Sequence, residues 1–453
     1  MARPTVPVAV RLMPICVAVA LCVGLIWSAG EVRSQLLEWD PELRPPKRDN
    51  ALTGTNLAER AFGSYARRVV KVRVLQRESV AHSTIGTGFF VTGAGHVMTN
   101  YHVVSEKIRH PDRYRVECQT ADGTTLSARI VAIDVVHDLA VLESEAAGPD
   151  HFMLSDANVD HGARLFSLGH PHDIGLTIVE GTYNGLLEHS LYRRIHFTGS
   201  INPGMSGGPT ITSGGEVVGI NVATAGHQIS FLVPVARARM LIEQVQRPSF
   251  VPPEDFSTAI REQLLSHQER VFADLLSHRP EAVTMGPYRL PGTLASYFRC
   301  WGDQQDKAGA RYSVRSHRCA TQDQIYLHAE LTSGEVRYSH YWLRSQRLNP
   351  FRFYTLFSGY FGSSAELPDA SPDELTDYEC TTDIVEHAAR PLKTAFCVRS
   401  YRRYAGLYDA VFKFASLGDS HQGVESALTM TGVSFDNALL LSRRYLEAVS
   451  WRR

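Results

Sequence analysis

Three residues whose side chains can together attack an acyl carbon occur along the chain in the order His102, Asp138, Ser206. A serine hydroxyl is a weak nucleophile until an imidazole accepts its proton. The imidazole in turn needs a carboxylate on its far nitrogen, which fixes the tautomer and stabilises the charged form. The residue types therefore predict nucleophilic acyl transfer, with Ser206 as the nucleophile, His102 as the base and Asp138 as its partner.

Chain order and local context narrow the architecture. His102 follows the apolar, β-prone run 88–91, Asp138 opens the short hydrophobic run 138–142, and Ser206 lies in the glycine-dense turn 202–209. The order His, Asp, Ser is that of two-barrel, chymotrypsin-like proteases, whereas subtilisins run Asp, His, Ser and α/β-hydrolases run Ser, Asp, His. The sequence therefore favours the two-barrel threading.

The glycines around Ser206 suggest an oxyanion hole. A tetrahedral oxyanion needs preorganised backbone N–H donors, and the expected pair is Gly204 and Ser206. A bulky replacement of Gly204 is expected to damage catalysis without unfolding the protein. The same turn matches the G-x-S-x-G elbow of serine esterases, but that elbow is followed by a helix, which Gly207, Gly208 and Pro209 oppose.

On these motifs the chain from about residue 59 to 245 resembles the HtrA-type (DegP-like) trypsin-fold serine proteases. The resemblance rests on the histidine segment 86–104, the aspartate segment 138–142, the connecting segments 154–156 and 168–171, the serine motif 201–209 and the strand 230–234. It implies a mostly β fold with a double six-stranded β-barrel, a Ser-His-Asp triad and endopeptidase activity on polypeptides. HtrA-type proteases often form trimers, so the resemblance also admits a homo-oligomer.

Two residues depart from the family pattern. Many members carry an aspartate where Thr198 stands and an asparagine where Met205 stands. Trypsin-like zymogens mature when a newly formed N-terminal ammonium pairs with an acidic side chain just before the nucleophile. Methionine cannot form that pair, so we expect no zymogen activation by this route. No PDZ module is evident, and the weak candidate at 358–361 is interpreted as an ordinary turn.

The substrate pocket is assigned with less support than the triad. Ser200, Ser230 and Phe231 are the candidates for its lining. No carboxylate stands at the expected base of the pocket. A small or medium apolar side chain is therefore expected before the cleaved bond, rather than lysine or arginine.

Composition excludes several partner classes. The net charge is -1 and 44% of the residues are hydrophobic, which fits a globular protein and gives no electrostatic case for nucleic-acid binding. The cluster His170-Pro171-His172 lies where the resemblance places a structural turn. We therefore expect no metal site and no cofactor. The resemblance to HtrA-type proteases implies that the substrates are polypeptides.

The N-terminus resembles an export signal. Basic residues precede the apolar run 12–27, and small residues follow it at 28–30. Cleavage near Gly30 predicts a periplasmic or secreted protein, and the alternative is an uncleaved N-terminal anchor with membrane association. The expected organisation is a signal peptide at 1–30, a linker at 31–58, the protease domain at 59–247, a helical linker at 248–284 and a separate α+β domain at 285–453.

The C-terminal part is predicted to be disulfide-bonded. Cys300, Cys319, Cys380 and Cys397 lie in a chain that reaches an oxidising compartment, and three pairings are open. Local spacing favours Cys300–Cys319 and Cys380–Cys397, with free thiols as the alternative, while Cys118 is expected to be a buried thiol. Alternating patterns predict strands near 311–315, 324–329, 335–343, 394–401, 410–415 and 424–431, and helices over 254–278 and from Asp436 to about 449.

Three functions compete at this point. A serine endopeptidase is favoured by the intact residue set. A protease-fold binding protein with little or no activity is the second, and a serine esterase is the third.

Overall fold

The computed structural model describes residues 56–78, 82–146, 148–154, 158–224, 229–305, 309–363 and 371–451. The predicted signal peptide and nearly all of the predicted linker lie outside these residues. From Asn56 onward the chain forms one compact unit. Among the helices in the described part of the chain, none is both long enough and apolar enough to span a membrane.

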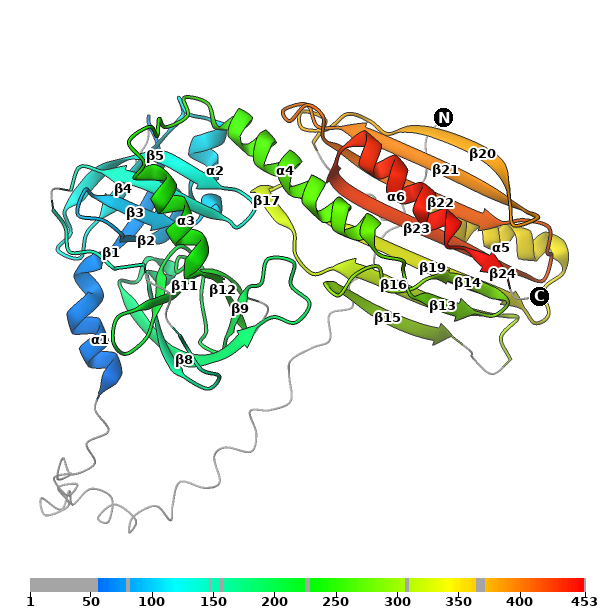
Figure 1. The fold of residues 1–453 in the computed structure, drawn as a ribbon, viewed down its shortest axis with the longest axis horizontal. Coiled ribbons are helices and arrows are strands. Elements are labelled where there is room, and N and C mark those ends of the chain that lie inside the picture. Colours follow the sequence, from blue (N-terminus) through cyan, green and yellow to red (C-terminus); the bar gives the residue numbers. More distant parts are fainter. Residues whose placement is uncertain are drawn as a thin grey trace, which may run out of the picture. The chain divides into compact units, whose positions relative to one another are not determined.

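The first half contains two closed six-stranded antiparallel barrels (Figure 1). The strands of the first are β1 (Val69–Gln76), β2 (His82–Phe90), β3 (His96–Thr99), β4 (Tyr114–Gln119), β5 (Thr125–Asp134) and β6 (Leu139–Ser144). Those of the second are β7 (Arg164–Gly169), β8 (Thr177–Leu186), β9 (Ile195–Phe197), β10 (Pro209–Ile211), β11 (Val217–Thr224) and β12 (Ser230–Pro234). Around them lie α1 (Leu57–Tyr65), η1 (Ala66–Arg68), α2 (Tyr101–Arg109), η2 (Pro171–Asp173) and α3 (Val235–Val245).

Alternation explains how the barrels close around apolar cores. In β1, Val70, Val72 and Val74 are fully buried, while Lys71 and Arg73 between them are only partly buried. A second cluster joins the barrels, because Phe89 and Met98 of the first pack with Phe166 of the second. The predicted mostly β fold with a double barrel is confirmed.

The C-terminal part is built on a seven-stranded antiparallel sheet in the order β15-β16-β19-β23-β22-β21-β20. Its strands are β15 (Phe298–Gln305), β16 (Tyr312–Thr321), β19 (Val336–Ser345), β20 (Glu379–His387), β21 (Arg390–Ser400), β22 (Tyr408–Ser416) and β23 (Gln422–Val433). The small strands are β13 (Ala282–Met285), β14 (Tyr288–Pro291) and β24 (Ser450–Trp451), which form a three-stranded sheet, and β17 (Ile325–His328) and β18 (Leu331–Ser333), which form a hairpin. The helices are α4 (Phe256–Ser277), α5 (Pro350–Ser363) and α6 (Phe435–Glu447).

Helices cover both faces of the large sheet. Successive residues of β19 point to opposite faces: Trp342 packs in the cluster with α4 and α6, whereas Leu343 packs under Phe353 and Phe357 of α5. The predicted α+β character of this region is thus confirmed.

Helix α4 links the two halves. Asp255 caps its start by accepting a hydrogen bond from the Ser257 N–H. Its first half contributes Ile260 and Leu264 to the core of the first barrel, and its second half contributes Phe272 to the core of the C-terminal sheet. The C-terminal part is therefore joined to the first barrel through the hydrophobic residues of α4.

Two local expectations were wrong. Residues 358–361, interpreted as a turn, lie inside α5, a helix that starts at Pro350 with Asn349 bonded to the Arg352 N–H. The last helix, expected to begin at Asp436, begins at Phe435 and is capped by Ser434, which accepts a hydrogen bond from the Asn437 N–H. In both helices the capping residue, Asn349 or Ser434, immediately precedes the first helical residue.

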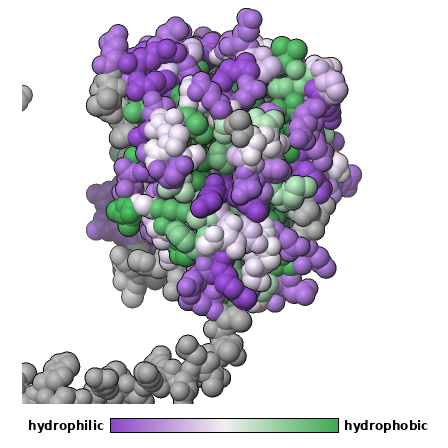
Figure 2. Space-filling model, turned by 90° about the vertical axis from the view of Figure 1, so that its left-hand side faces the viewer, coloured by the Kyte–Doolittle hydropathy of each residue, from purple (hydrophilic) through white to green (hydrophobic). Residues whose placement is uncertain are grey.

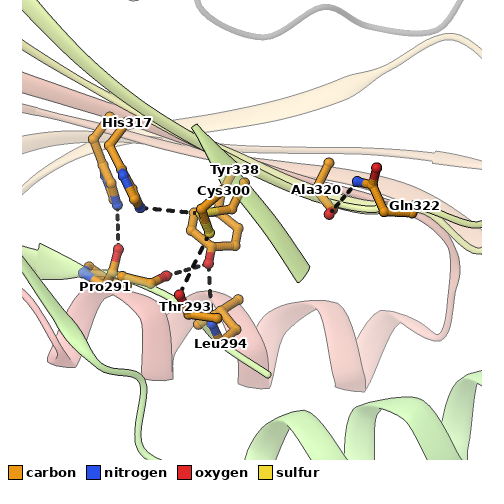
Figure 3. Close-up of a disulfide and its surroundings, with 11 residues drawn as sticks. Pro291, Thr293, Leu294, Cys300, His317, Ala320, Gln322 and Tyr338 are labelled. Atoms are coloured by element: carbon orange, nitrogen blue, oxygen red, sulfur yellow. Dashed lines mark hydrogen bonds between the residues drawn. A yellow bond between two sulfur atoms is a disulfide. The ribbon is translucent and has the colours of Figure 1, made fainter. Parts of the chain in front are cut away.

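The C-terminal sheet is cross-linked twice. Cys300 is bonded to Cys319 across β15 and β16, and Cys380 to Cys397 across β20 and β21. In each case the two cysteines are directly opposed in the strand register. Figure 3 shows the first bond, with the Thr293 hydroxyl 3.7 Å from the Cys300 sulfur. Cys118 is a fully buried free thiol, and burial raises its pKa to about 12.

Candidate active site

His102 and Asp138 form the best-defined part of the site. His102 is the second residue of α2, just after β3, and Asp138 occupies the turn between β5 and β6 with a φ of 59°. The Nδ1 of His102 lies 2.6 Å from Oδ2 of Asp138, and the His102 backbone N–H donates to Oδ1 at 2.8 Å. Asn100 donates from Nδ2 to the Asp138 carbonyl at 2.7 Å, so the strained turn is held by a buried side chain. The Asp138 carboxylate is thus hydrogen-bonded to both the backbone and the ring of His102.

Electrostatics favour a charged form of this imidazole. Burial of the ring disfavours the charge, but the negative charge of Asp138 and its hydrogen bond outweigh burial and raise the pKa of His102 above its usual value. The positive charge of Arg194 acts weakly in the opposite direction. The histidine is therefore held in the orientation and charge environment that a general base requires.

Ser206 lies in a turn that reaches across to the first barrel. Its carbonyl accepts a hydrogen bond from the Thr87 N–H at 2.8 Å. The adjoining Gly207 has a φ of 86°, and a Cβ there would press against Thr87 and Asn100. The residues beside Ser206 thus pack on the residues beside His102. Among the hydrogen bonds of the described residues there is none between Ser206 Oγ and His102 Nε2.

Two backbone donors in this turn have no acceptor among the residues that the structure describes. Within the described residues, neither the Gly204 N–H nor the Ser206 N–H donates a hydrogen bond, although Met205 between them donates to the Asn202 carbonyl. Gly204 has a φ of 95°, which favours glycine, and a Cβ there would collide with the carbonyl of His170. A bulky residue at 204 would therefore also strain the fold, which corrects the expectation that it would leave stability intact.

The chain after Ser206 is extended. Strand β10 begins at Pro209, three residues after the serine, and no helix follows the turn. This arrangement differs from the esterase elbow, in which the serine stands between a strand and a helix.

The pocket candidates lie at neighbouring segments. Ser230 is fully buried at the start of β12 and its hydroxyl accepts from the Ile201 N–H at 3.2 Å, whereas Ser200 is exposed. Phe231 is partly buried and packs against the cluster between the barrels. Met205 is fully buried in the core of the second barrel, with Leu165 and Phe197.

One cluster of side chains in the C-terminal sheet has the residue types of a metal site. In the described ranges, one group of cysteine, histidine and acidic residues brings its ligand atoms close together: Cys300, His317 and Cys319. Both sulfurs belong to the disulfide, and the His317 Nε2 lies 3.2 Å from one of them (Figure 3). His170, which belongs to the cluster His170-Pro171-His172 noted in the sequence, is buried, and burial lowers its pKa to about 4.

The structure adds residues that the sequence did not single out. The Thr87 hydroxyl donates to the Gly204 carbonyl at 2.6 Å and accepts from the His170 N–H at 2.9 Å, so it ties the histidine barrel to the serine turn. Its place between Gly86 and Gly88 was the available signal. Tyr326 contacts the ring of His102 from the C-terminal region, and no sequence pattern pointed to it.

Comparisons with known proteins match the part of the chain that carries this site. Residues 86–220 match the model of the trypsin-like peptidase domain. The chain is 29% identical over 184 residues to a probable periplasmic serine endoprotease DegP-like from Chlamydia trachomatis, covering 38% of this chain and 36% of the relative. It is 32% identical over 180 residues to Protease Do-like 1, chloroplastic, from Arabidopsis thaliana, covering 36% and 39%.

A solved structure of the serine endoprotease from Yersinia pestis shares 27% identity, with a TM-score of 0.37, over 43% of this chain and 68% of that one. The chain spans well under half the length of the curated relatives it matches. The matched residues 86–220 nevertheless include His102, Asp138 and Ser206, and they span most of the strands of both closed barrels. The chain thus carries an HtrA-like, trypsin-fold serine protease domain.

Proposed function

We propose that the protein is a serine endopeptidase that hydrolyses peptide bonds in polypeptides through His102, Asp138 and Ser206. The observation that carries the proposal is the pair of hydrogen bonds by which the Asp138 carboxylate accepts from the backbone N–H and from the ring Nδ1 of His102, with the serine turn packed beside it. The relatives named as serine endoproteases support the same reaction class.

In this proposal His102 Nε2 accepts the Ser206 proton as Oγ attacks the carbonyl carbon of the substrate. The oxygen becomes an oxyanion, which the N–H groups of Gly204 and Ser206 are free to bind. Asp138 stabilises the resulting imidazolium, which then protonates the leaving amine. A water molecule attacks the acyl-enzyme by the same route and releases Ser206.

The test is labelling of the full chain with a fluorophosphonate probe, with Ser206→Ala as the matched control. Labelling that depends on Ser206, followed by cleavage of casein, is the expected result. Removing the serine or histidine of a triad lowers turnover by about a million-fold, so the variant should be inactive. A wild-type chain that neither labels nor cleaves would instead be the binding protein considered above.

Parallel ester substrates address the third alternative. An esterase would cleave activated esters and leave casein intact. The extended strand after Ser206 favours the peptidase over the esterase.

The relatives and the N-terminal sequence support an exported location for the proposed activity. Periplasmic DegP-like relatives and the apolar run 12–27 support export to the periplasm or beyond. Fractionation of cells, with N-terminal sequencing of the mature protein, tests export and cleavage together.

A further inference from the structure

The catalytic histidine is contacted by a residue from outside the barrels. Tyr326 of β17 meets the His102 ring edge-on, with ring centroids 5.8 Å apart and an interplanar angle of 73°. Edge-to-face pairs of this geometry are attractive beyond the area they bury. The Tyr326 hydroxyl lies toward Ser105, whose own hydroxyl donates to the His102 carbonyl at 3.1 Å. Tyr326 therefore touches both the ring and the helix that carries it.

The neighbours of the two aromatic residues are also bonded. Tyr101 precedes His102, and its hydroxyl donates to the carbonyl of Leu327 at 3.0 Å. Both side chains are 2% exposed, so this hydrogen bond is shielded from water. It fixes the register between α2 and β17 one residue away from the Tyr326–His102 contact.

A second anchor holds the same segment to the other barrel. The carboxylate of Asp323, 4% exposed, accepts from the Ser190 hydroxyl at 2.9 Å and from the Leu191 N–H at 2.8 Å. Arg194 lies 3.7 Å from its other oxygen and is the same cation that acts on the pKa of His102. The loop between β8 and β9 is thus attached to the segment that carries Tyr326.

A third contact lies at the C-terminal end of α2. The buried carboxylate of Glu374 pairs with Arg109, the last residue of α2, and lies 3.6 Å from the Nε2 of His328. The segment 323–328 is therefore fixed before, at and after Tyr326, on both barrels. A side chain held this firmly restricts the positions that the His102 ring can take.

We propose that Tyr326 is a positioning residue for His102, and that the segment 323–328 completes the active site from the C-terminal region. The inference rests on the proposed function. It adds that a ring supplied by the C-terminal region holds the imidazole of the base against Asp138 and keeps water from one side of it.

The experiment compares Tyr326→Ala, Tyr326→Phe and the control Tyr354→Ala, which removes an exposed tyrosine of α5. Each is made in the full chain, and kcat and KM are measured on one peptide substrate from pH 5 to 9. We expect kcat of Tyr326→Ala to fall by about 3- to 10-fold, the factor that corresponds to one aromatic pair, with KM nearly unchanged. Tyr326→Phe and the control should behave as the wild type.

The pH profile separates positioning from general packing. Burial opposes the charge on His102, while Asp138 favours it and Arg194 opposes it. Removing the Tyr326 ring admits water, so the acidic limb of kcat should move to higher pH in Tyr326→Ala and stay in place in Tyr326→Phe. A loss of activity without this shift, or a wild-type profile in Tyr326→Ala, overturns the proposal.

Two further measurements keep the test decisive. If Tyr326→Ala fails to fold, Tyr326→Thr keeps a residue type suited to a strand, also removes the ring and admits water beside His102, and is expected to show the same shift. NMR titration of His102 in the Ser206→Ala background measures the effect of Tyr326 without any turnover. An unlabelled wild-type chain would refute the proposed function, whereas an unchanged His102 titration in Tyr326→Ala would refute the present inference.

Discussion

Replacing Asp138 by asparagine should expose how His102 is activated. The two oxygens of Asp138 accept from the backbone N–H and from Nδ1 of His102, at 2.8 and 2.6 Å. Asparagine has one carbonyl oxygen, so its NH₂ group must face one of these donors. If that group faces Nδ1, the ring adopts the tautomer with its proton on Nε2. His102 could then no longer accept the proton of Ser206.

The size of the effect follows from the geometry. Opposite unit charges 2.6 Å apart attract by about 6 kcal/mol at the effective dielectric constant of roughly 20 that suits such sites. This attraction is present when the imidazolium forms in the transition state and is lost in the asparagine variant. Each 1.36 kcal/mol is a factor of ten in rate, so we expect kcat to fall by about 10⁴-fold. The general account of serine triads gives the same order for this substitution.

The assay is cleavage of a peptide substrate from pH 5 to 9. Asp138 raises the pKa of His102, and the base must be neutral to accept a proton, so wild-type activity should rise with pH through a midpoint above the usual histidine value. Without the carboxylate that pKa falls, so the midpoint should move to lower pH, below a much reduced plateau. The Asp138→Asn substitution should change the free energy of unfolding much less than it changes the activation free energy.

The chain offers a matched control for this substitution. Asp134 holds His137 in the same way, with hydrogen bonds of 3.0 Å to the backbone N–H and 2.7 Å to Nδ1, but outside the proposed triad. Asp134→Asn should change kcat by less than about tenfold, since only tertiary packing is touched. Equal losses in the two variants, or an Asp138→Asn enzyme within tenfold of the wild type, would refute the reasoning.

Three further predictions concern the turn, the pocket and the sheet. Thr87→Val leaves the Gly204 carbonyl and the His170 N–H without partners, a loss of about 1–3 kcal/mol, so kcat should fall by about 5- to 150-fold; a fluorophosphonate labelling rate equal to that of the wild type would contradict this. A peptide library should be cleaved mainly after small or medium apolar residues, because no carboxylate is found among Ser200, Ser230 and Phe231; cleavage mainly after arginine would show that the pocket is misassigned. Replacing Cys380 and Cys397 together by serine opens a loop of 17 residues and should lower the free energy of unfolding by roughly 3 kcal/mol in guanidinium titrations, and a change below about 0.5 kcal/mol would mean that the bond does not form.

The sequence predicted the parts of the molecule that depend on local signals. The three proposed triad residues are surrounded by short motifs, and the resemblance of these motifs to those of HtrA-type proteases implied the double barrel. Both disulfides join strands that are neighbours in the sheet and close in sequence, so spacing was enough to favour the pairs found. Helix α5 was missed because its aromatic residues resemble a strand, and its start depends on Asn349 and Pro350 rather than on a long apolar pattern.

The contacts that join the two halves could not be predicted in this way. Asp323 reads as an ordinary polar residue before a strand, yet it is buried because two donors from the β8–β9 loop meet its carboxylate. A buried charge costs free energy unless such partners are present, so its burial depends on residues more than 130 positions away. Tyr326 has the same property, since alternation in β17 places it on the opposite face from Ile325 and Leu327 but does not show what it contacts. The residues that most closely link the C-terminal region to His102 are therefore those whose roles depend on tertiary contacts, and the Tyr326 variants test that dependence directly.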